Sequence, residues 1–219
     1  TLLSEEEGIT RLAVPGARRP KGRLSAAAPL TLLRLQISGK KGLKRVHQIK
    51  VIHSYINAGK TLESLAAAQA ITELVLMLVP VNDPVPGILS AILTHIDRLQ
   101  EINKSITKPD KNILLALAST LQTSVHLLAL GGYGLPLQTC CITNAPLDPP
   151  LGEWDWRCSV IPEQGFAIGS NSSSAIELNP SELALLQRLP RSSLPVKSNG
   201  ELIGPQDLNP CKDLNPTLQ

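Results

Sequence analysis

The chain has 219 residues and a net charge of +3, values that exclude little by themselves. A chain of this length can bury one large core or two small ones, so we expect one or two domains. Aromatic residues make up only 2% of the sequence, so aliphatic side chains must form most of any core. The sequence has no unbroken apolar run of about 18–20 residues, the length that a membrane span requires, and we expect no membrane contact.

The charges are unevenly distributed along the chain. Residues 1–60 contain twelve Lys or Arg residues and three acidic residues, a net charge of +9, whereas the remaining 159 residues have a net charge of −6. Such asymmetry is typical of a segment that faces a polyanion, joined to a part with another role. A solvated basic surface that binds nothing would give the same distribution, so charge alone leaves both interpretations open.

The first 57 residues show the pattern of strands and turns. Alternation of apolar and polar residues, interrupted by Pro and Gly, predicts three strands, over 8–14, 30–37 and 46–53. In the third strand this alternation puts Val46, Gln48, Lys50 and Ile52 on one side and His47, Ile49, Val51 and His53 on the other. We expect a small antiparallel barrel with basic loops.

Helical spacing of apolar residues begins after Gly59. It predicts helices over 61–79 and 88–103, and a third from Pro109 to a stop at Gly131. The third is apolar on most sides, so we expect it to be the central helix. A fourth helix follows Asn179, since Asn at the N-cap, Pro at the next position and Glu182 at the third form a capping box.

These elements predict an α+β protein with three parts. We expect a β-domain over 1–57, a helical domain over 58–204 with a non-helical insertion at about 140–178, and a disordered tail over 205–219. The insertion contains both tryptophans of the chain and has no helical period.

No catalytic constellation is evident in the sequence. The four histidines lie in unrelated predicted elements, and each suits a surface or a core position better than a catalytic one: His47, His53, His95 and His126. Residues 39–42 lack the length and the Ser/Thr of a phosphate-binding loop, and Gly131-Gly132 ends a helix instead of opening one. We therefore predict that the protein is not an enzyme and uses no cofactor.

The cysteines give a weak metal signal. Cys140 and Cys141 are adjacent, so their side chains diverge, and Cys158 and Cys211 stand alone. A structural zinc site needs four converging ligands, usually two Cys-x-x-Cys pairs. We expect neither zinc nor a disulfide framework, in keeping with a reducing cytoplasm. Redox chemistry of the adjacent pair and simple packing both stay open, with packing the simpler interpretation.

Two clusters of basic residues are the candidate DNA-binding site. They lie in and after predicted loops: Arg18, Arg19, Lys21, Arg23, Lys40, Lys41, Lys44 and Arg45. Cationic loops on a small barrel can track a phosphate backbone. Tyr55 is the only aromatic residue in this segment, so we expect binding that is mostly electrostatic, weakly sequence-specific and sensitive to salt.

Several segments resemble the RecO family in the order in which they follow one another. These are Gly8 to Leu24, with its Val-Pro-Gly-Ala-Arg-Arg-Pro-Lys run, Gly42 to Tyr55, Leu127 to Cys140, with Gly-Gly-Tyr-Gly-Leu-Pro-Leu-Gln-Thr-Cys, and Leu178 to Pro180. The resemblance covers about residues 1–190. It implies an N-terminal OB-fold and a helical domain with a zinc-ribbon-like insertion.

The resemblance also implies a function. RecO proteins bind single- and double-stranded DNA and anneal complementary strands without catalysis. With RecR and single-stranded-DNA-binding protein as partners, they help to load recombinase at single-stranded gaps during DNA repair. We therefore expect a cytoplasmic, nucleoid-associated protein.

Two departures from the family pattern qualify this expectation. Thr143, Gly169 and Ser172 stand where zinc-binding members have cysteines, so we expect an insertion without metal. The family's barrel also begins with a further strand, and this chain starts at Thr1 within what reads as a strand, so we expect an N-terminally incomplete barrel. A protein-interaction scaffold with little DNA affinity is the alternative function.

Overall fold

The structure is a computed structural model that describes residues 1–15, 28–39, 44–104, 109–171 and 176–194. These residues form four α-helices and three small sheets, which confirms the predicted α+β class. The strands described form no closed barrel. The chain divides into two compact units, Thr1–Gly131 and Gly132–Gln219. The domain limits predicted at 57 and 204 stay predictions, and the predicted tail lies outside the described residues.

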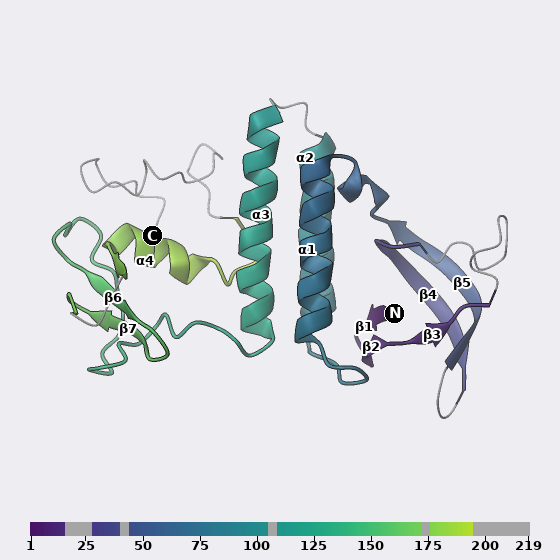
Figure 1. Cartoon of the computed structure of the whole chain (residues 1–219), viewed down its shortest axis with the longest axis horizontal. Helices are drawn as coiled ribbons and strands as arrows, with labels where there is room; N and C mark the ends of the chain where they lie inside the picture. The colour runs from purple at the N-terminus through teal and green to yellow at the C-terminus, as the bar shows by residue number, and fades with distance from the viewer. Residues whose placement is uncertain (16–27, 40–43, 105–108, 172–175, 195–219) are drawn as a thin grey trace. The chain divides into compact units, whose positions relative to one another are not determined.

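Five strands belong to the first unit (Figure 1). They are β1 Leu2–Ser4, β2 Gly8–Thr10, β3 Leu12–Ala13, β4 Thr31–Ser38 and β5 Lys44–Ser54. The first two form a hairpin, and the others form a sheet in the order β3-β5-β4, in which β3 is parallel to β5 and β4 is antiparallel to it. This sheet is open, because β3 and β4 are both edges.

Gly8 allows the β-hairpin to approach the helical part closely. Its φ is +65°, and a Cβ at this position would lie 2.4 Å from the backbone oxygen of Asp83. The neighbouring Ile9 accepts a hydrogen bond from the N–H of Asn82 at 2.9 Å. Only glycine fits both the backbone angle and the space here.

Three long helices follow the strands. A 3-10 turn, η1 Ile56–Gly59, leads into α1 Leu62–Leu78, and then come α2 Ile88–Lys104 and α3 Pro109–Leu130. Asn103, near the end of α2, donates to Ser64 Oγ at the start of α1 over 2.8 Å, so these two helices are antiparallel. The core that the three helices share is mostly aliphatic, as the sequence predicts, and includes Ala68, Ile71, Ile88, Leu99 and Leu127.

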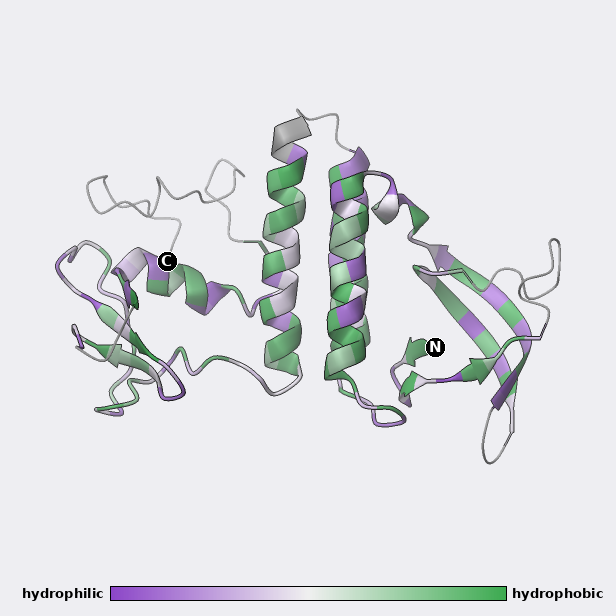
Figure 2. Cartoon of the chain, viewed as in Figure 1, coloured by the Kyte–Doolittle hydropathy of each residue, from purple (hydrophilic) through white to green (hydrophobic). Residues whose placement is uncertain are grey.

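The third helix packs against both of the others, but it is not buried on all sides. One face of α3 is buried at Ala116, Ser119 and Leu127, whereas Leu117 on the opposite face is 65% exposed. Three helices packed together have no inner member, so an apolar helix can keep an open side. Residues 112–130 are also long and apolar enough to cross a membrane by length and composition, a test that core helices pass as well. Figure 2 shows the hydrophobic residues along this helix.

The second unit is a small sheet with one helix. Its strands β6 Cys158–Ile161, β7 Gly165–Ile168 and β8 Ile176–Leu178 are ordered β7-β6-β8, and α4 Pro180–Arg188 follows. Both hydrogen bonds of the predicted capping box are present: the Glu182 N–H donates to Asn179 Oδ1 at 3.0 Å, and the Asn179 N–H donates to Glu182 Oε2 at 2.9 Å.

Candidate nucleic-acid interface

The longest strand pair of the chain forms a two-stranded ribbon within the first unit (Figure 1). Strand β4 pairs along its whole length with β5, in register from Thr31↔Ser54 to Ser38↔Arg45. The register shifts twice, between Leu32 and Leu33 and between Gln36 and Ile37. At each shift β5 carries one residue more than β4, which is the arrangement of a β-bulge.

One face of this ribbon is polar. Directly opposed residues share a face, and alternate residues of β4 point the same way, so the strand register defines this face. We call the following three exposed cross-strand pairs the polar face: Arg34 with Lys50, Gln36 with Gln48, and Ser38 with Arg45. The alternating hydrophilic and hydrophobic bands of β4 and β5 are visible in Figure 2.

The other face is apolar and only partly covered. Its opposed pairs are Leu33 with Val51, Leu35 with Ile49, and Ile37 with Val46. Val46 is buried, but Ile37 and Val51 are each more than 40% exposed. The predicted assignment of sides in β5 was therefore wrong at both bulges. The extra residue His47 separates Val46 from Gln48 and Lys50, and the extra residue Ile52 separates His53 from Ile49 and Val51.

The part of the chain that the structure describes offers no charge partner to the three cations of the polar face. Among the described residues, no hydrogen bond or ion pair engages Arg34, Arg45 or Lys50, and the face contains no acidic residue. Positive charges placed side by side without acids are available to bind anions. The arrangement could therefore hold phosphate groups.

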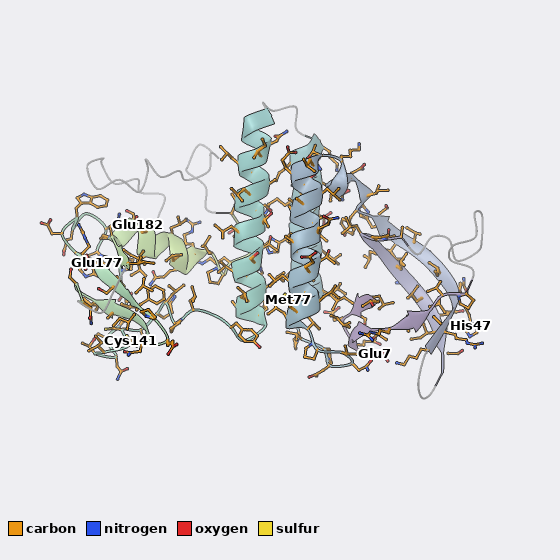
Figure 3. All side chains as sticks on the ribbon, in the orientation of Figure 1. Glu7, His47, Met77, Cys141, Glu177 and Glu182 are labelled. Carbon is orange, nitrogen blue, oxygen red and sulfur yellow. The ribbon has the colours of Figure 1, made fainter. Side chains whose placement is uncertain are left out.

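Lys44 behaves differently from its neighbour Arg45. Its Nζ forms an ion pair with Glu7 Oε1, and the side chain is partly buried. The hydrogen bond from Lys44 lowers the pKa of the Glu7 carboxyl, so this carboxylate keeps its charge. Figure 3 labels Glu7 beside the strands and His47 farther out on the ribbon. Lys44, one of the predicted DNA-binding cations, is therefore already paired with Glu7.

Two histidines lie on the ribbon. His47 Nε2 contacts Ser38 Oγ across the strands. His53 lies opposite Leu32 at the start of β4, on the same side of the ribbon as the polar face. Its Nε2 lies 3.4 Å from Gln100 Nε2 of α2. The His53 ring also meets the Tyr55 ring edge-on, with centroids 4.5 Å apart. The contact of His53 with Gln100 attaches this end of the ribbon to α2.

The structure brings only part of the predicted site into view. Arg45 lies on the polar face and Lys44 beside it, whereas the other six predicted cations lie outside the described residues: Arg18, Arg19, Lys21, Arg23, Lys40 and Lys41. Sequence reasoning missed Arg34, Lys50 and the two glutamines. The signal was present in the alternation of 31–38, but which residues oppose one another depends on the pairing with β5.

The cysteines of the second unit that the structure describes form no metal site. No group of three or more His, Cys, Asp or Glu side chains among the described residues could hold a metal ion. Burial alone would raise the pKa of Cys140, but hydrogen bonds from Thr143, from its N–H and from the N–H groups of Ile168 and Ile142 lower it to about 7. Cys158 differs, because burial raises its pKa to about 11.

A buried polar cluster joins α2 and α3. His95 Nε2 lies 3.0 Å from His126 Nδ1, and Arg98 Nη1 donates to Gln122 Oε1 at 2.6 Å. His95 is fully buried, and burial, followed by the charge of Arg98 and by His126, lowers its pKa to about 4. A histidine held neutral between packed helices suits a structural role better than catalysis.

Comparison with known proteins relates the sequence of this chain to a family. Residues 1–55 match the description "Recombination protein O N terminal", and residues 59–206 match "Recombination protein O C terminal". A protein named DNA repair protein RecO from Synechococcus sp. (strain WH7803) is 56% identical over 206 residues, which cover 94% of this chain and 75% of the relative.

Two further relatives carry the same name. The protein of Prochlorococcus marinus (strain MIT 9303) is 56% identical over 95% of this chain and 77% of its own length. That of Trichodesmium erythraeum (strain IMS101) is 27% identical over 89% of this chain and 73% of its own length. The similarity therefore spans both units and extends to distant relatives.

Proposed function

This chain belongs to the RecO family of DNA repair and recombination proteins, and from that premise we propose that it binds single- and double-stranded DNA through the polar face and anneals complementary strands. The observation that carries the proposal is the row of unpaired cations at Arg34, Arg45 and Lys50. Phosphate contacts supply most of the sequence-independent affinity of proteins for DNA.

The mechanism is charge neutralisation without a covalent step. Two DNA strands repel each other through their phosphates, and a cationic surface that holds both lowers this repulsion. Bases can then pair while the backbones stay bound. The loop cations add to the surface in this proposal; Lys40 and Lys41 lie in the sequence between β4 and β5, and Arg18 to Arg23 lie between β3 and β4.

The finer family properties are part of the same proposal. The strands of the first unit would belong to an OB-fold, and the second unit would correspond to the zinc-ribbon-like insertion and its following helix. RecR-like protein and single-stranded-DNA-binding protein would be the protein partners, and the site of action would be the cytoplasmic nucleoid. Recombinase loading at gaps would follow from these contacts.

A second candidate is a protein-interaction scaffold with little affinity for DNA. The exposed apolar residues of the helices favour it, since Leu114, Leu117 and Leu121 of α3 are each more than half exposed. Exposed apolar surface is typical of protein contacts. The two candidates differ in whether DNA binds to this chain directly.

The experiment is an annealing assay beside a binding assay. Two complementary oligonucleotides, one with a fluorophore and one with a quencher, are mixed with and without the protein across a salt series. We expect the protein to accelerate quenching, and the acceleration to fall with salt in parallel with fluorescence anisotropy on the single strand. If the protein is folded by circular dichroism but neither binds the single strand nor accelerates quenching at low salt, the scaffold function is the candidate that remains.

A further inference from the structure

The middle of the polar face is uncharged. Gln36 and Gln48 oppose each other there, with the pair Arg34 and Lys50 on one side and Arg45 on the other. Neither glutamine forms a hydrogen bond with another described residue, and both are exposed. We infer that the two glutamines contact unpaired bases and give this face a preference for single-stranded DNA, an inference that rests on the proposed function.

The spacing of the three cross-strand pairs supports this assignment. Successive pairs on one face are two residues apart along β4, which corresponds to about 7 Å. An extended single-stranded backbone repeats at a similar distance. A strand laid along β4 and β5 would therefore place phosphates at the two cationic ends and a nucleotide over the glutamines.

The chemistry of the glutamine side chain suits a base. Its amide offers both donors and an acceptor, so it can pair with the donor and acceptor groups of any base edge. Phosphate offers only acceptors, for which Arg and Lys are better partners. An amide pair between cations is therefore better matched to the base of the middle nucleotide than to its phosphate.

The composition of the face leaves few other groups for the bases. Aromatic side chains are the usual stacking partners of single strands, but Tyr55 is buried and meets His53 in the structure. His47 is engaged with Ser38. On the described part of the ribbon, the glutamines are the uncharged groups placed to read bases.

The preference for single strands follows from the base edges. In a duplex the Watson–Crick edges are already paired, so the glutamines would find them occupied, whereas the phosphates stay accessible to the cations. When a complementary strand pairs with the bound one, base–base hydrogen bonds would replace the glutamine contacts. The cations would keep hold of the backbone, and the glutamine contacts would end with annealing.

The test separates the glutamines from the cations. We would compare Gln36→Thr/Gln48→Thr with Arg34→Gln/Lys50→Gln in the complete chain, using anisotropy on single-stranded and duplex oligonucleotides across a salt series. Threonine keeps strand propensity and removes the amides. Gln69→Ala, at an exposed glutamine of α1, is the control.

We expect two distinct signatures. The glutamine variant should lose about threefold to tenfold in affinity for the single strand, keep its salt slope and keep its affinity for the duplex. The cation variant should lose affinity for both, and its slope on the single strand should fall by about 0.7 for each lost contact.

An unchanged single-strand affinity in the glutamine variant, or an equal loss on the duplex, would overturn the inference while the proposed function stands. Wild-type protein that is folded and binds neither oligonucleotide would overturn both. Circular dichroism of each variant is recorded with the binding data, so a loss of affinity caused by unfolding is recognised. In that case a Gln36→Asn/Gln48→Asn variant, which keeps the amides, decides whether the glutamine amides contact the bases. Its partial recovery of single-strand affinity supports the inference, and no recovery contradicts it.

Discussion

His95 shows how burial fixes the protonation state of one residue. Its imidazole lies between α2 and α3, and burial, the charge of Arg98 and His126 lower its pKa from 6.5 to about 4. The folded state therefore binds this proton less tightly than the unfolded state does. The contribution of His95 to the free energy of unfolding is therefore fully present above about pH 6.5 and is lost as the pH falls toward 4. The free energy of unfolding changes with a slope of at most about 1.4 kcal/mol per pH unit.

We predict that the free energy of unfolding of the wild-type protein falls between pH 7 and pH 5 by more than that of His95→Gln. Denaturation with urea at both pH values, followed by circular dichroism, gives this difference. The variant controls for the titrating groups that do not contact His95. Equal pH dependence of the two proteins would show that His95 already binds a proton in the folded state.

Lys44 and Arg45 show that the surroundings of a cation also determine whether it has a charge partner. They are adjacent and alike in sequence, yet Glu7 pairs with the first and leaves the second free. The partner is 37 positions away, and no local pattern indicates it. Sequence could therefore identify the basic segment but could not separate cations that are paired from those that are available.

At the scale of elements, local signals predicted well and pairing signals did not. The start of α4 was read from Asn179, Pro180 and Glu182 alone, because a capping box involves only neighbouring residues. The sides of β5 were misassigned because bulges shift the alternation, and a bulge depends on which residues of β4 oppose it. The polar face of the ribbon is such a paired feature.

The capping box gives a prediction for the second unit. We expect Asn179→Ala to lower the free energy of unfolding of this unit by about 1 kcal/mol, because the N–H of Glu182 loses its acceptor. Both tryptophans, Trp154 and Trp156, lie in this unit, so their fluorescence during denaturation reports on it. Asn179→Asp keeps an acceptor oxygen and should retain most of the stability. Equal losses in the two variants would mean that the side-chain oxygen does not cap the helix.

The open face of α3 gives a second element prediction. Leu127 is fully buried, whereas Leu117, on the same helix, is 65% exposed. Leu127→Ala should therefore cost about 2–5 kcal/mol, and Leu117→Ala should stay within about 0.5 kcal/mol of the wild type. The helical circular dichroism signal during denaturation checks both. A large loss in Leu117→Ala would show that this side of α3 is covered in solution.

At the scale of the whole molecule, the charge asymmetry of the sequence pointed to the segment in which the polar face lies before any element was known. Residues 1–60 have a net charge of +9, whereas the rest of the chain has −6, and Arg34, Arg45 and Lys50 of the ribbon belong to this basic segment. The family followed from the order of short segments along the chain and is confirmed by matches over both parts. Packing, not pattern, determines that one face of α3 is exposed, so the apolar pattern alone could not indicate it.

The central claim is that the polar face binds DNA, and one comparison tests it most directly. Fluorescence anisotropy with a labelled single strand across a salt series would compare Arg34→Glu/Lys50→Glu with Lys60→Glu/Lys104→Glu, which makes the same change in net charge at exposed positions outside the face. We predict at least about a tenfold loss for the face variant, with a slope reduced by about 1.4, and a small loss with an unchanged slope for the control. Equal losses in two folded variants, or wild-type binding by the face variant, would contradict the account.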